Sequence, residues 1–215
     1  MLQILSTKIL DEKYTQPIKN IGFEWVSYDA IEILHLKNEV IPKVIENAII
    51  TSKNAFKAVK NKTKINNAFC VGEQTAKLLL ENQINVVETA HYAEDLAKKI
   101  IQNHNSKSFI FLSGNLRRDT IIYVLEKENI MIEECVVYET QLVPKKFDQS
   151  FEAVLFFSPS GVKSYYQTNS SHNEIAFCIG STTAKEVEKY NQNIQIAEQP
   201  TYQKLVDKVI NYYKK

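Results

Sequence analysis

Hydroxyl-bearing residues follow the end of an apolar segment near residue 158. Ser158, Pro159 and Ser160 come directly after the apolar run 154–157. Ser158 is a good helix N-cap, and Pro159 suits the first helical position because its missing N–H is not needed there. A turn of this kind places hydroxyls and free backbone N–H groups where a helix begins, and such a position favours carboxylate or phosphate. The chemistry predicted here is therefore recognition of an anion by neutral donors.

The same turn chemistry recurs along the chain. Residues 69–79 match residues 177–187 at six of eleven positions, and Ser52 aligns with Ser158 after an apolar run. Helix capping explains any one of these hydroxyls, but their repetition in both halves favours a binding site. The predicted ligand-binding residues are Thr51, Ser52, Lys53, Gly72, Thr75, Ser113, Gly114, Arg117, Ser158, Ser160, Gly161, Gly180, Thr182 and Thr183.

Tyr138 is the residue with the clearest potential for proton chemistry. It stands at the end of the β-rich segment 132–138. A phenol there can donate a proton or a hydrogen bond to a ligand. An aromatic ring that only packs between domains explains the residue equally well.

Other polar residues give weaker signals. Arg117 and Arg118 can clamp an anion, although water-facing charges on the first turns of a helix explain them equally well. Glu133 and Glu134 are neighbours on a predicted strand and face opposite sides, so they are no acid/base dyad. Scattered histidines with polar neighbours are expected to be solvated surface residues, namely His35, His91, His104 and His172.

Strand and helix patterns alternate along the whole chain, which predicts α/β architecture with parallel sheets. The expected strands are 2–5, 23–26, 48–50, 67–71, 86–87, 109–112, 132–138, 154–157, 175–179 and 194–197. The expected helices include 14–20, 39–47, 93–102, 117–128 and 202–213. Parallel sheets bind ligands beyond the carboxyl ends of their strands, where the turns named above lie.

The repeat predicts two similar Rossmann- or flavodoxin-like domains with a split arrangement. Residues 1–29 are expected to fold with residues 144–215, and residues 37–137 to form an inserted domain. The chain then crosses between the domains at 30–36 and 138–143, which we expect to form a two-stranded linker. The two sets of turns would line an active cleft between the domains.

Composition excludes several classes of protein. The 215 residues carry a formal net charge of +1, which argues against nucleic-acid and membrane partners. We expect a cytoplasmic protein, because no signal peptide and no apolar run of about 18 residues is present. Cys70, Cys135 and Cys178 lie in apolar runs without a CxxC motif, so we expect buried free thiols and no metal site. Nucleotide fingerprints of the GxGxxG or GxxxxGK[ST] type are absent.

Taken together, these motifs resemble the uroporphyrinogen-III synthase family over nearly the whole chain. The resemblance rests on the order and spacing of residues 49–55, 71–76, 137–140, 157–162, 179–184 and 200–201. Ser6, Thr7 and Lys8 stand where the family commonly has a Thr-Arg pair, so the sequence differs there.

The resemblance implies a cofactor-free cyclisation in tetrapyrrole and heme biosynthesis. The family converts linear hydroxymethylbilane to uroporphyrinogen III, with loss of water and inversion of ring D. The family tyrosine that matches Tyr138 is the favoured assistant for loss of the hydroxyl, and the residues matching Thr51, Ser52, Ser158, Ser160, Thr182 and Thr183 line the cleft. We expect a monomer that receives its substrate in a transient handover from hydroxymethylbilane synthase.

Other function classes stay open at this point. One is a non-catalytic two-domain protein that binds a small polyanion or a sugar, although no export signal supports it. Another is a structural or regulatory protein built on an α/β scaffold. Fold alone decides among none of these.

Overall fold

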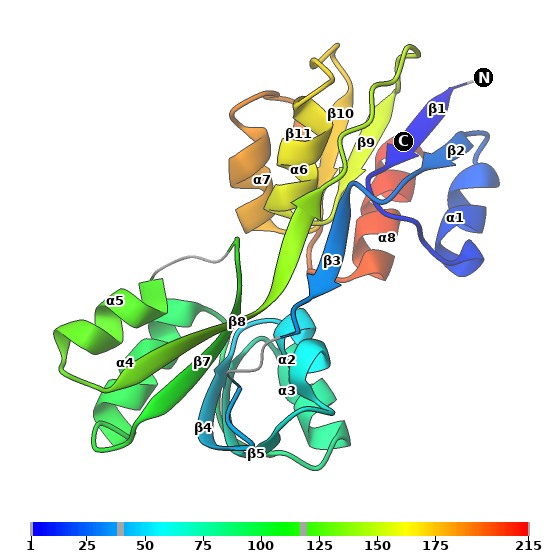
Figure 1. The fold of residues 1–215 in the computed structure, drawn as a ribbon. Coiled ribbons are helices and arrows are strands. Elements are labelled where there is room, and N and C mark those ends of the chain that lie inside the picture. The colour runs from blue at the N-terminus through cyan, green and yellow to red at the C-terminus, as the bar shows by residue number, and fades with distance from the viewer. Residues whose placement is uncertain (1, 38–40, 117–119, 215) are drawn as a thin grey trace. The chain divides into compact units, whose positions relative to one another are not determined.

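The computed structural model of the chain describes residues 2–37, 41–116 and 120–214. Contacts divide the chain into two compact units. Unit 1 comprises Met1–Glu32 and Gln141–Lys215, and unit 2 comprises Ile33–Thr140 (Figure 1). Each unit contains a mainly parallel sheet with helices, as the alternating pattern predicts.

The sheet of unit 1 has the strand order β11-β10-β9-β1-β2, and its neighbouring strands are parallel. The N-terminal strand β1 lies between β2 and the distant β9, so both ends of the chain build this sheet. Its strands are β1 (Gln3–Ser6), β2 (Glu24–Ser27), β9 (Ala153–Phe156), β10 (Ile175–Cys178) and β11 (Ile194–Ile196). Its helices are α1 (Glu12–Lys19), α6 (Pro159–Tyr166), α7 (Ser181–Val187) and α8 (Tyr202–Tyr213).

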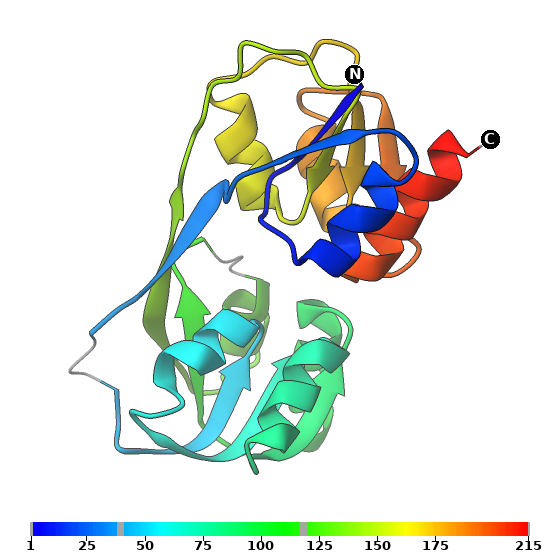
Figure 2. The same ribbon diagram turned by 90° about the vertical axis from the view of Figure 1, so that its right-hand side faces the viewer.

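Helices cover both faces of this sheet because its central strands are apolar at nearly every position. Alternate residues of a strand point to opposite faces. Leu5 and Phe156 therefore join one core cluster with α6 and α7, whereas Ile4 and Phe177 join another with α1 and α8. Figure 2 shows α1 and α8 side by side.

The sheet of unit 2 has the order β3-β8-β7-β4-β5-β6. Its strands are β3 (Ile31–His35), β4 (Val44–Ile50), β5 (Lys64–Val71), β6 (Asn85–Ala90), β7 (Phe109–Gly114) and β8 (Ile132–Leu142). Its helices are α2 (Lys53–Val59), α3 (Glu73–Glu81), α4 (Ala93–Asn103) and α5 (Thr120–Lys127). The Leu36 N–H donates to the Val137 carbonyl at 3.0 Å, and the Val143 N–H donates to the Ala30 carbonyl at 2.9 Å. The hinge role of these segments stays a prediction.

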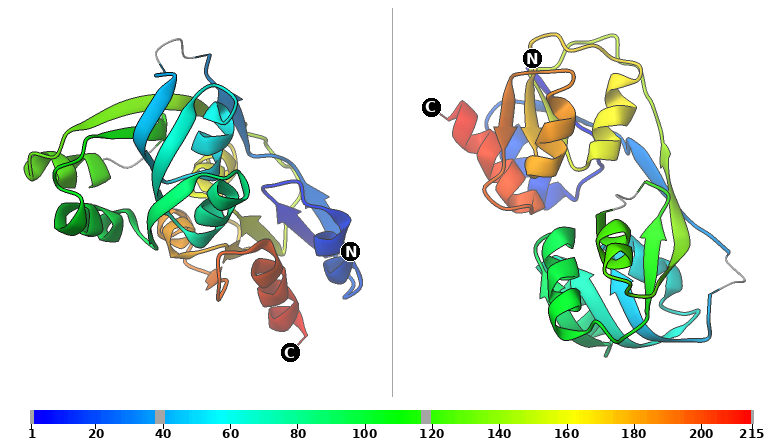
Figure 3. Two further views of the ribbon diagram at one scale, coloured as in Figure 1. Left: turned by 90° about the horizontal axis from the view of Figure 1, so that it is seen from below. Right: turned by 90° about the vertical axis from the view of Figure 1, so that its left-hand side faces the viewer.

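Unit 2 is also covered on both faces. Ile50 and Cys70 pack with α2 and α3, and Ile49 and Phe69 pack with α4 and α5 (Figure 3). The thiols of Cys70 and Cys178 are buried, and burial raises the pKa of Cys178 to about 12.

The predicted helix at 39–47 is wrong for residues 41–47, and residues 39 and 40 lie outside the described part of the chain. Val44 and Ile45 begin β4, where they pair with Lys64 and Ile65 of β5. Exposed and buried residues alternate there, as in a strand with one covered face. A short apolar segment does not distinguish a helix from a strand, and pairing with β5 decides it.

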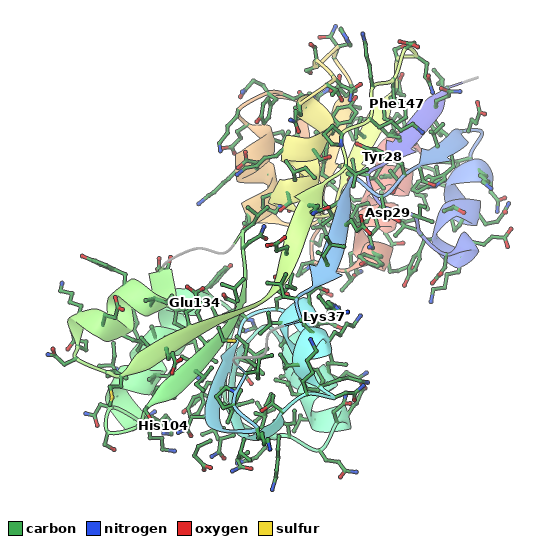
Figure 4. The ribbon with its side chains drawn as sticks, viewed as in Figure 1. Tyr28, Asp29, Lys37, His104, Glu134 and Phe147 are labelled. Atoms are coloured by element: carbon green, nitrogen blue, oxygen red, sulfur yellow. The ribbon has the colours of Figure 1, made fainter. Side chains whose placement is uncertain are left out.

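His104 does not lie on the solvated surface, contrary to expectation (Figure 4). It caps the end of α4, and its side chain is only 15% exposed. Its Nε2 lies 3.4 Å from Glu88 Oε1, and Lys99 Nζ lies 3.2 Å from Glu88 Oε2. Burial raises the pKa of Glu88, but the hydrogen bonds from Lys99 and His104 outweigh it and hold this pKa below its usual value.

Glu88→Gln is expected to lower the free energy of unfolding at neutral pH by about 1 kcal/mol, because a carboxylate that pairs with Lys99 and is hydrogen-bonded to His104 is lost. A carboxyl whose pKa is depressed by folding stabilises above its ordinary pKa, and this contribution is lost as pH falls through the folded value. Urea unfolding should therefore show a difference between wild type and variant at pH 7 that shrinks below about pH 4. Glu81→Gln, in an exposed pair with Lys77, is the control. An equal difference at both pH values would contradict the assignment.

Candidate functional site

The turn after β9 in unit 1 is built as its sequence predicts. Ser158 is the N-cap of α6, and its Oγ accepts a hydrogen bond from the Gly161 N–H at 3.1 Å. Pro159 occupies the first turn of the helix. Ser158 and Ser160 are half-buried. The Ser158 O–H remains able to donate to a ligand while its oxygen accepts from the backbone.

Gly161 brings this turn against the end of β1. A Cβ added to Gly161 would lie 3.4 Å from Ser158 Oγ and 3.5 Å from Thr7 Oγ1. Thr7 is buried, and its Oγ1 donates to the Leu155 carbonyl at 2.8 Å. The sequence analysis did not predict Thr7 as a neighbour of this turn. Its position directly after an apolar strand could have indicated it, because the other predicted turn residues follow strands in the same way.

The turn after β10 contains two threonines that were predicted to bind a ligand, and they differ in exposure. Gly180 is the N-cap of α7 and lies near Pro200, whose Cβ would be 3.9 Å from an added Cβ. Thr182 is exposed, whereas Thr183 is buried on the inner side of its helix. Less of Thr183 than of Thr182 is open to a ligand, and its predicted role in binding stays a prediction.

In unit 2, the turns after β4 and β5 carry the corresponding residues. Thr51 and Ser52 are half-buried, Lys53 is exposed, and Ser52 Oγ accepts from the Asn54 N–H at 3.1 Å. Gly72 has φ +85°, a conformation that favours glycine, and its N–H donates to the Ala90 carbonyl at 2.8 Å. Thr75, in α3, is buried.

The carboxyl end of β7 lies beside Tyr138, which stands within β8. Gly114 and Tyr138 are partners in the parallel ladder, and Tyr138 is half-buried. Ser113 is 2% exposed, and its Oγ donates to Glu134 Oε1 at 2.5 Å, a contact that the sequence did not reveal. Glu134 is labelled in Figure 4. Glu133 is exposed while Glu134 is half-buried, so the two carboxylates do face opposite sides as predicted. Arg117 and Arg118 lie outside the described residues.

The opposite, amino edge of the unit 2 sheet contains a cavity of about 660 Å³. Its lining includes Glu46, Glu126 and Glu133 and none of the predicted ligand-binding residues. Three carboxylates repel a polyanion, whereas the carboxyl edges of both sheets carry hydroxyls, helix N-termini and the lysines Lys8 and Lys53. The carboxyl edges are therefore the better candidates for an anionic ligand.

Among the residues that the structure describes, no group of three or more His, Cys, Asp or Glu side chains is placed to hold a metal ion. Within that same part of the chain, no helix is both long enough and apolar enough to cross a membrane.

These features define a two-unit α/β protein whose sheets carry hydroxyl-bearing turns at their carboxyl edges. The sequence model of the family described as uroporphyrinogen-III synthase HemD matches residues 12–207. The chain therefore belongs to the uroporphyrinogen-III synthase family. Enzymes of this family act on a small-molecule tetrapyrrole.

Known relatives agree with this assignment. The "Porphyrin biosynthesis protein HemD" of Ruminiclostridium josui is 24% identical over 232 aligned positions, which cover 91% of this chain. The chain spans only 45% of the length of that relative. The uroporphyrinogen-III synthetase of Helicobacter pylori has a TM-score of 0.74 at 20% identity, over 99% of this chain and 100% of that one. A mutant uroporphyrinogen III synthase of Thermus thermophilus has a TM-score of 0.68 at 10% identity, over 100% and 98% of the respective chains. These two likenesses show a shared fold.

Proposed function

We propose that this chain closes linear hydroxymethylbilane to uroporphyrinogen III, with inversion of ring D and loss of water. The observation that carries the proposal is the family match over residues 12–207. The reaction needs no redox partner and no cofactor, because it exchanges one C–O bond for one C–C bond and releases water.

Tyr138 is the proton or hydrogen-bond donor to the departing hydroxyl in this proposal. The C–O bond breaks with its electron pair on oxygen, and a proton from the phenol completes the water molecule. The electron pair of ring D then forms a C–C bond at the ring carbon that already bears a methylene bridge. The bond from that bridge to ring D breaks and re-forms at the free α-carbon of ring D, which inverts the ring. This carbon loses its proton, and the proton restores the phenol directly or through solvent. Positioning of the reacting ends supplies the rest, and in favourable cases it contributes about 7 kcal/mol or more.

The carboxyl edges of both units hold carboxylates of the substrate. The bilane carries eight of them, so many weak contacts can share its binding. Neutral hydroxyls and helix N-termini suit this task, because they bind anions without the cost of burying a charge. Ser52, Ser158, Ser160 and Thr182 are exposed or half-buried and are proposed as contacts. Burial makes Thr75, Ser113 and Thr183 weaker candidates.

Ser158→Ala is expected to raise the KM for the bilane about tenfold, because one hydrogen bond to a charged group is lost. The variant should also lose about 1 kcal/mol of stability through the missing N-cap. Steady-state kinetics and thermal unfolding measure both effects. Ser106→Ala, at an exposed serine in a turn of unit 2, is the matched control and should change neither. An unchanged KM alongside the loss of stability would leave Ser158 as a cap only.

A coupled assay tests the function itself. Hydroxymethylbilane is generated from porphobilinogen by its own synthase, this protein is added, and the oxidised porphyrin isomers are separated by chromatography. Spontaneous closure gives isomer I, so a switch to isomer III establishes the reaction. Isomer I alone from folded protein would refute the proposal and favour the two-domain binding protein, which the same bilane tests by direct binding.

We further propose that the protein acts as a cytoplasmic monomer that receives the bilane in a transient handover from hydroxymethylbilane synthase. Free bilane closes spontaneously to isomer I, so a direct transfer between the two enzymes would limit this side reaction. Sedimentation of this protein alone and with that synthase tests both the monomer and the handover.

A further inference from the structure

The ladder between β7 and β8 changes register at its carboxyl end. Pairing runs regularly from Phe109 with Ile132 to Ser113 with Val136, and then moves to Gly114 with Tyr138. Val137 is therefore an extra residue in β8, and its side chain is fully buried in the core cluster that includes α2 and α3. An extra residue of this kind bends a strand and re-aims the side chain that follows it. Here that side chain is Tyr138.

The ring of Tyr138 rests on the α-carbon of Gly114. A Cβ added at Gly114 would lie 2.6 Å and 2.7 Å from Tyr138 Cε2 and Cε1, and closer still to Cζ. The Gly114 backbone does not have positive φ, unlike that of Gly22 and Gly72. Glycine is therefore required at 114 by the space that the ring occupies and not by backbone conformation. Tyr138 also packs against the core cluster that includes α2 and α3.

Asn115 holds the backbone around Tyr138. Its N–H donates to the Tyr138 carbonyl at 3.2 Å, and its Oδ1 accepts from the Thr140 N–H at 2.8 Å. The side chain of Asn115 thus continues the ladder beyond the last residue of β7. These two hydrogen bonds fix the backbone before and after Glu139. The Tyr138 ring itself contacts Gly114 and the core cluster.

We propose that Gly114 and Asn115 are positioning residues, which set the location of the Tyr138 phenol for the reaction. The inference rests on the proposed function, in which that phenol assists loss of the hydroxyl. Gly114 acts through the absence of a side chain, and Asn115 acts through its amide. A displacement of about 1 Å in a reacting group can cost about 100-fold in rate, so control of this ring matters for turnover.

A double-mutant cycle in the coupled assay separates this role from a general structural one. Gly114→Ala should lower kcat for isomer III nearly as much as Tyr138→Phe, with KM changed by less than about twofold. Adding Gly114→Ala to Tyr138→Phe should lower kcat no further than about twofold, because both act through one hydroxyl. Asn115→Ala should lower kcat about threefold or more in the same direction. Independent effects that multiply in the double variant would overturn the proposal, as would an unchanged kcat in Gly114→Ala.

A second measurement does not depend on activity. With 3-fluorotyrosine placed at 138, the ¹⁹F resonance should shift in Gly114→Ala, whereas the same label at the exposed Tyr123 should not respond. If Gly114→Ala is too unstable to study alone, it should fold when combined with Tyr138→Ala, because the clashing ring is then absent. An unmoved resonance at 138, or failure to fold even without the ring, overturns the proposal. Wild-type protein that gives only isomer I refutes the proposed function instead, while the ¹⁹F result still reports on the ring.

Discussion

Tyr138→Phe is expected to lower turnover in the coupled assay by about 100-fold, at the lower end of what a general acid contributes. The ring and its packing on Gly114 and the core remain in the variant, so the fold and KM should change little. Some activity should persist, because many carboxylate contacts still bring the ends of the bilane together and water can protonate the leaving hydroxyl. The measurement is the initial rate of isomer III formation at saturating bilane.

The matched control for this prediction is Tyr123→Phe. Tyr123 lies on α5 in the same unit and is 68% exposed, so loss of its hydroxyl should leave turnover unchanged. Full turnover in Tyr138→Phe would remove the phenol from the mechanism. The positioning residues proposed above would then have no hydroxyl to act through, whereas the synthase function would stand on the isomer assay alone.

Phe69→Ala and Phe177→Ala are each expected to lower the free energy of unfolding by about 3–5 kcal/mol. The two residues are equivalent in the internal repeat, and both side chains are fully buried. Phe69 packs with α4 and α5 in unit 2, and Phe177 packs with α1 and α8 in unit 1. Each substitution leaves a cavity under two helices, so the loss exceeds the transfer free energy of the ring alone.

Calorimetry with limited proteolysis measures these losses unit by unit. A chain with two compact units need not unfold in a single step, so each variant should destabilise mainly the transition of its own unit. Tyr92→Ala is the surface control, because Tyr92 is 64% exposed. A loss below about 1 kcal/mol in either core variant would contradict the assignment of that ring to the core.

Much of the fold follows from local sequence pattern. Apolar runs of four to eight residues alternate with amphipathic segments, and in a parallel sheet covered on both faces such runs are buried strands. The N-caps at Ser52, Ser158 and Thr201 are also local, because a hydroxyl needs only the N–H groups of the next turn. The helix prediction for the segment from Val44 was wrong because its strand conformation is not local. It depends on pairing with β5 in the sheet.

For the candidate site, too, some features follow from the sequence and others only from the tertiary structure. The residue types alone predicted that Ser158 and Thr182 lie in turns that follow apolar strands, and β9 and β10 end just before these turns. The sequence also predicted that a strand ends at Tyr138, but β8 continues to Leu142. Only the tertiary structure decided which of these residues are covered, because Thr183 is buried on α7 and the Ser113 hydroxyl is bonded to Glu134 of the next strand.

The placement of the Tyr138 ring was likewise beyond the sequence. It depends on an extra residue in β8 and on the missing side chain of Gly114 in β7. These two strands are neighbours in the sheet although their residues are far apart in the sequence. Periodicity describes one element at a time, whereas register and close packing arise only when elements meet.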